Sequence, residues 1–420
     1  MKKNLARSAF LKNMEQMRHG SLRWTDGSDS QLFGDPSSDL RAEVTVQDPS
    51  FYWKLVSGGE DGAGDAYVDG LWTSADPVAV VRFAIRNLDS LEQGNRLTSF
   101  VSRILNRLAH LRRDNTVEGS RRNIHEHYDL SNAFFRLFLD TRMVYSSAVY
   151  EREATSLEAA QMEKIDRLCR KLGLQPGDHL LEIGTGWGAM ALHAAEVYGC
   201  RVTTTTISRQ QFEGAQAAFA RSSAGGRIEL LFEDYRKLTG QYDRIVSVEM
   251  FEAVGLDHYD EFFSACDRLL KPDGAMAMQA ITMNEQKFAA YQKGSDWIQK
   301  RIFPGAELAS VKEILASLQR ATKMSLLHLE DIGIHYALTL AEWRKRFHER
   351  EDEVRKLGFD DRFIRTWDYY LAYCEAAFRE RHIGDVQLVM TKNNNVRWMP
   401  GDPGVSVGGT YAREVVGSQQ

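Results

Sequence analysis

Cysteines, long apolar runs and an excess of positive charge are scarce or missing in this sequence. The four cysteines form no CxxC pair, which argues against a zinc cluster or a disulfide framework and predicts a reducing compartment, the cytoplasm. The formal net charge of −5 excludes a broadly basic protein that binds nucleic acid without sequence preference. No run of about 18 apolar residues occurs, and the N-terminus lacks the apolar core of a signal peptide, so neither a membrane span nor secretion is predicted.

Several catalytic signatures are also missing. The eleven histidines show no HExxH spacing, and we predict no metal site. No G-x-S-x-G elbow is present that would make a serine a nucleophile. The segment Glu249–Ala253 lacks the Asn-Pro-Pro-aromatic pattern with which base amino-methylases hold a flipped base, so nucleic acid is not an expected partner.

The composition that remains is that of an ordinary globular protein. Hydrophobic residues make up 43% and charged residues 26% of the 420 residues, without a low-complexity tract. At roughly 150 residues per domain, this length predicts two or three domains. We expect a smaller mixed N-terminal domain over 1–111, a linker over 112–123, a larger α/β domain over 124–392 and a C-terminal tail over 393–420.

The larger domain alternates short apolar strands with helical segments. This pattern is typical of a doubly wound, mostly parallel sheet. Residues 282–384 read as a helical, aromatic-rich insertion that covers the carboxyl edge of the sheet, where open α/β folds bind ligands. The predicted strands are 179–183, 201–206, 228–232, 244–248, 275–281 and 385–391.

A glycine-rich turn follows the first of these strands. Leu180–Gly188 reads L-L-E-I-G-T-G-W-G and leads directly into a helix, so that a cofactor can approach bare backbone and the free N–H groups of the helix. The turn is not GxGxxG, and the second strand ends in Thr203–Thr206 without an acidic residue, which argues against a nicotinamide cofactor. The E-x-G-x-G-x-G form is similar to the first motif of S-adenosylmethionine-dependent methyltransferases.

Further motifs make this resemblance more specific. They are His127–Asn132, Met143–Ala148, Thr206–Gln211, Glu233–Tyr235, Asp243–Val248, Met250–Gly255 and Ile302–Gly305. Their order and spacing over about 124–392 resemble the family of cyclopropane-fatty-acyl-phospholipid synthases and mycolic acid methyltransferases. The N-terminal portion is more loosely similar to the extra domain of bacterial cyclopropane synthases.

The resemblance implies an activity and a cofactor site. S-adenosylmethionine would methylate a carbon of a cis double bond in an acyl chain of membrane phospholipid, and the resulting carbocation would lose a proton as a cyclopropane ring closes. The protein would associate peripherally with the inner face of the membrane. The implied cofactor-binding residues are Tyr145, Ser146, Glu182, Gly184, Thr185, Gly186, Trp187, Gly188, Thr206, Ile207, Gln211, Glu233 and Asp234.

The resemblance also implies a buried bicarbonate that takes the proton. The family holds this ion with a Cys, a Glu, a His, a backbone group at an Ile, and a Tyr. The Glu, Ile and Tyr match Glu252, Ile281 and Tyr336, whereas Ser147 and Gln279 replace the Cys and the His. A further cysteine that is noted in the family matches Cys374, whose default role is that of a small core residue.

The two replacements leave the base and the product open. Ser147 and Gln279 can still donate hydrogen bonds to an oxyanion, but Gln279 cannot accept a proton as an imidazole can. The base is then bicarbonate or water held by Glu252 and Tyr336, or Glu252 itself. Deprotonation at a different carbon would give a methylene or methyl-branched chain in place of a cyclopropane.

Two other questions stay open at this level. The basic stretches 1–18 and 103–122 could contact an anionic lipid surface, or the first could be a helix that packs on its own domain. The aromatics of 282–384 could line an acyl-chain tunnel or pack among themselves. Methylation of a soluble small molecule, a lipid-surface scaffold without catalysis, and a homodimer also remain alternatives.

Overall fold

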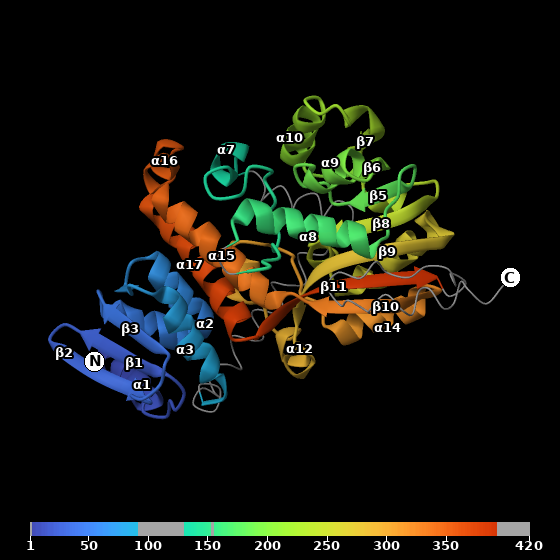
Figure 1. Ribbon diagram of the computed structural model, residues 1–420. Coiled ribbons are helices and arrows are strands. Elements are labelled where there is room, and N and C mark those ends of the chain that lie inside the picture. Colours follow the sequence, from blue (N-terminus) through green and yellow to red (C-terminus); the bar gives the residue numbers. More distant parts are fainter. Residues whose placement is uncertain (1, 91–129, 153–154, 393–420) are drawn as a thin grey trace.

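The computed structural model describes residues 2–90, 130–152 and 155–392 (Figure 1). Within these ranges the chain forms a small N-terminal domain and a larger α/β domain. The predicted linker, the basic stretch 103–122 and the tail 393–420 lie outside the described residues. None of the helices in the described part of the chain is long and apolar enough to cross a membrane.

The N-terminal domain combines a small sheet with helices: α1 (Lys2–Met14), β1 (Ser21–Asp26), β2 (Asp29–Gly34), β3 (Arg41–Val46), α2 (Ser50–Val68), β4 (Trp72–Thr73) and α3 (Pro77–Arg86). The strand order is β2-β1-β3-β4, with β1 and β3 parallel. Side chains of β3 alternate between exposed and buried, because polar and apolar residues alternate along Arg41–Val46 and successive side chains of a strand point to opposite faces.

The first helix uses its apolar face inside its own domain. Phe10, Met14 and Met17 are buried, and the Phe10 ring lies 4.6 Å from the Trp24 ring and 5.6 Å from the Tyr52 ring, centroid to centroid. Apolar side chains that pack in this way cannot at the same time enter a lipid surface. The structure therefore supports the alternative in which this segment packs on the protein.

The large sheet has seven strands: β5 (His179–Ile183), β6 (Arg201–Thr205), β7 (Ile228–Leu231), β8 (Tyr242–Val248), β9 (Leu270–Met283), β10 (Met324–Asp331) and β11 (Ile383–Lys392). Their order is β10-β11-β9-β8-β5-β6-β7. β11 runs antiparallel to β9 and β10, and the other neighbours are parallel. The predicted mostly parallel α/β sheet is confirmed, and its seventh strand, β10, lies outside the six predicted strand ranges.

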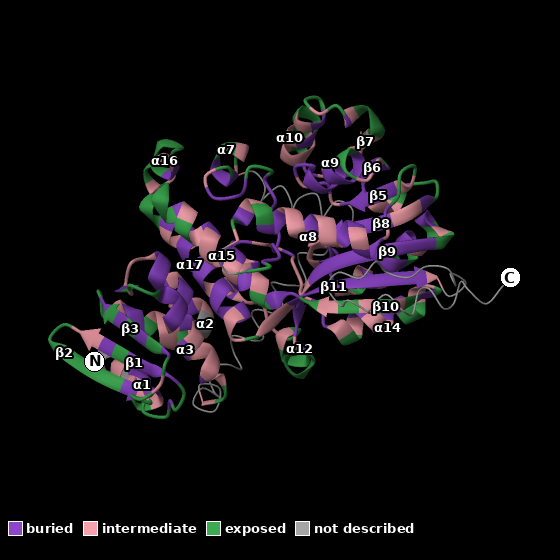
Figure 2. Cartoon of the chain, viewed as in Figure 1, coloured by how far each residue is buried: buried purple, intermediate pink, exposed green. Residues whose placement is uncertain are grey.

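Helices cover both faces of this sheet: α8 (Leu157–Lys171), α9 (Ala189–Glu196), α10 (Arg209–Phe219), α11 (Tyr259–Leu269) and α14 (Val311–Ala321). The short helix α7 (Asn132–Phe135) does not belong to these layers, since its Phe134 ring packs on the Trp367 ring at 4.9 Å. Alternate strand residues face opposite layers. Leu180 packs in the core cluster of α8, α9 and α10, whereas Leu181 packs in that of α11 and α14. Figure 2 shows β9 and β11 mostly buried between these layers.

The sequence predicts one helical insertion over 282–384, and the structure shows that this prediction is wrong in part. α14 and β10 lie within this segment but belong to the sheet and its covering layer. The strand β10 is at the edge of the sheet, and its apolar residues Leu327 and Leu329 are exposed. The rest forms a helical cover: α12 (Glu285–Tyr291), α13 (Trp297–Arg301), α15 (Gly333–Glu349), α16 (Glu351–Lys356) and α17 (Asp361–Arg379).

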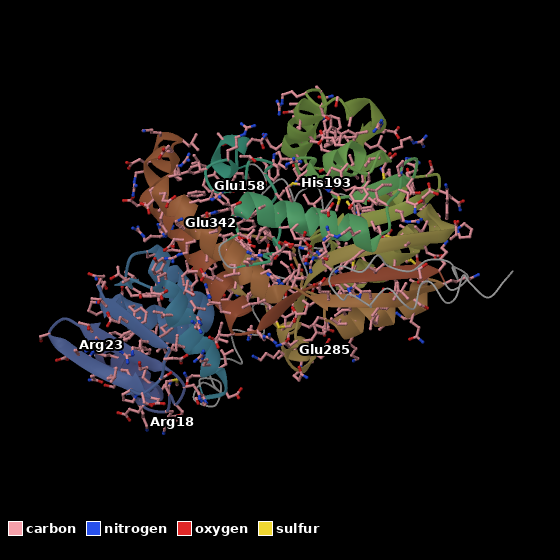
Figure 3. The ribbon with its side chains drawn as sticks, viewed as in Figure 1. Arg18, Arg23, Glu158, His193, Glu285 and Glu342 are labelled. Carbon is pink, nitrogen blue, oxygen red and sulfur yellow. The ribbon has the colours of Figure 1, made fainter. Side chains whose placement is uncertain are left out.

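The cover joins the sheet domain to the N-terminal domain. Arg346 of α15 bonds to Glu342 on its own helix and to Glu158 of α8, and Figure 3 shows these two glutamates on the facing helices. On the other side, α2 and α3 pack along α17, where the Tyr67 hydroxyl donates to Asp368 (Figure 1). The cover is therefore held from both sides.

Close packing at this junction predicts a glycine-specific effect. A Cβ on Gly64 of α2 would lie 2.7 Å from ring atoms of Trp297 and of Tyr369, which are both buried. Gly64→Ala should therefore destabilise the protein by about 1–3 kcal/mol, read as a lower midpoint in urea unfolding. Gly58→Ala in the same helix is the matched control, because its Cβ meets no atom within 4 Å. Equal midpoints for the two variants would contradict this packing.

Candidate active site

A cavity of about 190 Å³ lies at the carboxyl ends of β5, β6 and β8. Of the predicted cofactor-binding residues, it is lined by Tyr145, Ser146, Glu182, Gly184, Thr185, Gly186, Trp187, Thr206, Ile207, Gln211, Glu233 and Asp234. Gly188 does not line it: it begins α9 with φ 92°, and a Cβ there would overlap the Phe219 ring at 2.4 Å. Gly188 thus serves the packing of the turn.

The turn after β5 has the shape that a cofactor needs. Gly186 lines the cavity with φ 53°, and a Cβ added to it would meet no protein atom within 4 Å. Bare backbone therefore faces open space, with the first residues of α9 directly behind it. The turn and the cavity fit an elongated cofactor such as S-adenosylmethionine.

The polar residues of this cavity are held in different ways. Glu182 accepts a hydrogen bond from the Thr204 hydroxyl at 2.6 Å, and its burial raises its pKa to about 8. Asp234 is buried and pairs with Arg236, whereas Glu233 is exposed. Lys164 of α8 also lines the cavity, with its ammonium against the Ser146 hydroxyl. Sequence reasoning missed Lys164, because only the fold brings α8 to this edge of the sheet.

A second cluster adjoins this cavity, and Glu249 is at its centre. Three groups donate hydrogen bonds to the Glu249 carboxylate: the Ser147 backbone N–H (2.8 Å) and the Gln279 side-chain amide (2.7 Å) to Oε1, and the Tyr336 hydroxyl (2.8 Å) to Oε2. Glu249 itself lines the cofactor cavity. Three of the predicted catalytic residues are therefore brought together, but around a carboxylate that was not predicted.

This arrangement corrects the expected roles of Ser147 and Glu252. The Ser147 hydroxyl donates to the Ala148 carbonyl, so this residue offers its backbone N–H to the acid. Glu252 accepts the Ile281 backbone N–H, and its other oxygen is buried without a hydrogen-bond partner among the described residues. Tyr336 contacts Glu249 and not Glu252.

The expected bicarbonate does not fit this cluster. The donors that would hold such an ion, from Ser147, Gln279 and Tyr336, all bond to Glu249. The Glu249 carboxylate therefore stands where the ion would have to bind. Burial and the neighbouring Glu249 raise the pKa of Glu252 to about 8, so Glu252 retains a proton at neutral pH.

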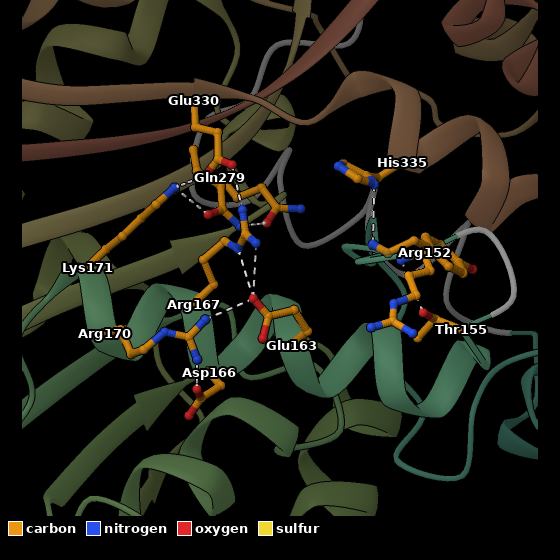
Figure 4. A network of polar contacts seen from close by, with 12 residues as sticks. Arg152, Thr155, Glu163, Asp166, Arg167, Arg170, Lys171, Gln279, Glu330 and His335 are labelled. Carbon is orange, nitrogen blue, oxygen red and sulfur yellow. Dashed lines mark hydrogen bonds and ion pairs between the residues drawn. The ribbon is translucent and has the colours of Figure 1, made fainter. Parts of the chain in front are cut away.

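A chain of polar side chains fixes which end of the Gln279 amide faces Glu249. The Lys171 ammonium can only donate, and it donates to the Gln387 carbonyl oxygen at 2.8 Å. The Gln387 nitrogen then donates to the Gln279 oxygen at 2.9 Å, which leaves the Gln279 nitrogen for Glu249. Figure 4 shows Lys171 and Gln279 in this network beside Glu330, which pairs with Lys171.

Cys374 is not among the residues that line the cavity, and of the aromatics in the cover Tyr336 is the one that bonds to Glu249 in the described part of the chain. Cys374 packs at the border of the core cluster, and burial raises the pKa of its thiol, so it is a thiol and not a thiolate. The Trp343 ring lies 5.3 Å from that of Tyr145, and the Tyr336 ring stacks on Phe378 at 4.5 Å. These rings form one core with the N-terminal domain and also enclose the site.

The sheet order, the glycine-rich turn and the cavity at the carboxyl ends define a methyltransferase of the S-adenosylmethionine-dependent class, and S-adenosylmethionine is its cofactor. The family model for mycolic acid cyclopropane synthetase matches residues 116–388, and the chain belongs to this family.

Known relatives extend this match. The chain is 38% identical to tuberculostearic acid methyltransferase UfaA1 of Mycobacterium tuberculosis, over 79% of this chain and 78% of that one. It is 35% identical to the cyclopropane-fatty-acyl-phospholipid synthase of Escherichia coli K12, over 84% and 88%. Among solved structures it resembles the cyclopropane synthase MmaA2 of M. tuberculosis with 32% identity and a TM-score of 0.61, over 65% of this chain and 98% of that one.

The bare turn predicts a binding effect in addition to the backbone strain that alanine has at a positive φ. Gly186→Ala would place a methyl group in the cofactor cavity and should weaken the binding of S-adenosylmethionine at least about 10-fold in calorimetry, roughly 1.4 kcal/mol or more. Gly177→Ala is the control, because that glycine also has a positive φ (91°) and open space around its Cβ but lies outside the cavity. Equal dissociation constants for the two variants would exclude the turn as the cofactor site.

The raised pKa of Glu252 predicts a pH-dependent stability difference. Between its ordinary value of 4.5 and about 8 the unfolded chain ionises this group while the folded protein keeps it protonated, so folding loses stability as the pH rises through this window. Glu252→Gln should therefore gain in Tm relative to the unsubstituted protein from pH 5 to pH 8. Glu285→Gln, at an exposed position on α12 (Figure 3), is the matched control for the same chemical change. The same pH dependence of Tm for both variants would contradict the raised pKa of Glu252.

Proposed function

We propose that this protein methylates a carbon of the double bond in unsaturated acyl chains of membrane phospholipid, as a peripheral enzyme at the cytoplasmic face. The observation that carries this proposal is the carboxylate of Glu249 between the cofactor cavity and an aromatic enclosure. Methylation of an alkene leaves a carbocation, and such a site offers both a negative group and ring faces to it.

The length of the match supports a phospholipid substrate. The cyclopropane-fatty-acyl-phospholipid synthase of E. coli aligns over 84% of this chain, whereas cyclopropane mycolic acid synthase 1 of M. tuberculosis aligns over 64%. The described N-terminal domain packs against α17, so it adds to the wall behind the acyl-chain region. A domain in this position is suited to admit an acyl chain from a lipid surface.

The residues of the site divide the work of the reaction. S-adenosylmethionine, when bound, supplies an electrophilic methyl group. The turn at Gly184–Gly186 would bind the cofactor against backbone that carries no side chain at Gly186. The rings of Tyr145, Trp343 and Tyr336 exclude water from the carbocation, and each ring face stabilises it by about 0.5–2 kcal/mol.

The product depends on how fast the cation loses its proton. Immediate loss from the transferred methyl group closes a cyclopropane. A slower loss allows a hydride shift to the more stable tertiary cation, and the same proton then leaves to give a methylene branch. Burial raises the pKa of the Glu249 carboxylate, so its strength as a base does not by itself favour slow proton loss, and we keep both products as candidates. The relation to a protein named as a tuberculostearic acid methyltransferase supports the branched product.

A labelling experiment tests the function. The protein is incubated with vesicles of dioleoyl phosphatidylglycerol and phosphatidylcholine and with methyl-labelled S-adenosylmethionine, and label is expected in the lipid fraction. Proton NMR of the released acyl chains separates the products, since cyclopropane protons resonate far upfield and methylene protons in the alkene region. Vesicles of saturated lipid are the control. Absence of label from the unsaturated vesicles would refute the proposal.

A further inference from the structure

The Glu249 carboxylate occupies a pocket that is built for an oxyanion. Its donors come from three separate parts of the chain: the segment before α8, strand β9 and helix α15. Ser147 and Gln279 are fully buried and Tyr336 is nearly so, so these donors have no water to bond to. Three converging donors at 2.7–2.8 Å are the usual surroundings of a bound oxyanion, and here a side chain of the protein supplies it.

We propose that Glu249 is the catalytic base of this enzyme, a built-in carboxylate that takes the place of an exchangeable anion. The proposal rests on the proposed function and deepens it. It assigns proton removal to a residue three positions before Glu252, the residue that the family resemblance selects.

The backbone supports this assignment. Glu249 has φ 46°, a left-handed conformation that costs about 1 kcal/mol or more in a residue other than glycine. Its backbone N–H donates to the Gln279 carbonyl at 2.8 Å, so the same two residues are joined by main chain and by side chains. A strained glutamate at a cavity wall, held in place by its neighbours, is typical of a functional position.

The charges around Glu249 favour its ionised form over that of its neighbours. Lys164 is fully buried on α8 and attracts the negative charge of Glu249. Asp385 on β11 and Glu252 each have a raised pKa, and the negative charge of Glu249 is a cause in both. Tyr336 on α15 also stays protonated and donates. The negative charge of this cluster is therefore on Glu249, although burial raises the pKa of that residue too.

The step balances without a further reactant. The alkene gives two electrons to the methyl group, the S–CH3 bond breaks and a C–CH3 bond forms, which leaves one positive charge on the acyl chain. A C–H bond of the new methyl group then breaks. Its proton bonds to a carboxylate oxygen of Glu249, and its electron pair forms the ring bond or the C=C bond.

Chemical rescue tests the proposal on the full-length protein. Glu249→Gly removes the carboxylate from a position whose backbone suits glycine and leaves the three donors to an added anion. We expect kcat on unsaturated vesicles to fall by about 10²–10⁴-fold. Formate or bicarbonate, added at about 50 mM, should raise the kcat of this variant again by at least about tenfold. Glu249→Gln should lose kcat similarly without rescue, because the amide fills the pocket.

Three controls make the outcomes distinct. Glu285→Gln, an exposed Glu-to-Gln change, should keep full activity with and without anion. Both Glu249 variants should show the circular dichroism spectrum and the cooperative urea unfolding of the unsubstituted protein, which separates lost chemistry from lost folding. If Glu249→Gly does not fold, Glu249→Gln decides by its kcat.

The proposal is overturned if Glu249→Gln keeps its kcat, if Glu249→Gly is active without an added anion, or if bicarbonate stimulates the unsubstituted protein. Failure of the proposed function looks different: the unsubstituted protein then puts no label into lipid at all.

Discussion

A negative charge shut away from bulk water has to be compensated by the protein, and at Glu249 this requirement holds the site together. The donors come from residues 147, 279 and 336, which are far apart in the chain and belong to the segment before α8, the central sheet and the cover. Leaving a buried charge unpaired costs several kcal/mol, so the three parts can separate only at that cost. One carboxylate thus adds to the contacts that fix the cover over the cofactor cavity, through Tyr336 of α15.

Much of the sheet could be predicted from the sequence, because its central strands are buried on both faces and read as short apolar runs. The period-two strand β3 was equally legible. The strand β10 was not, since its Leu327 and Leu329 lie on the exposed side of an edge strand, so that its apolar residues do not follow its burial, and its place inside 282–384 suggested a helix. The basic N-terminal helix was ambiguous for a similar reason: a helix with apolar side chains on one face can pack on lipid or on protein, and only Trp24 and Tyr52 decide which.

The candidate site divides in the same way. A local motif predicts the cofactor turn, because its glycines are adjacent in sequence and act through backbone shape. The second cluster depends on distances between strands, which no single motif records. The segment Glu249–Glu252 contains two acids, and family likeness selects Glu252. Only the fold reveals that Ser147, Gln279 and Tyr336 bond to Glu249, and that Glu252 keeps to the Ile281 backbone.

The chain of side chains from Lys171 to Gln279 has a wider consequence. An amide has nearly the same shape either way round, so packing alone would let Gln387 and Gln279 present oxygen or nitrogen to their neighbours. The ammonium of Lys171 removes this ambiguity for both, one after the other. The charge of Lys171 thereby determines that Gln279, two side chains away, presents its N–H group and not its oxygen to Glu249. The chemical character of the site is thus encoded partly by a residue that does not touch it.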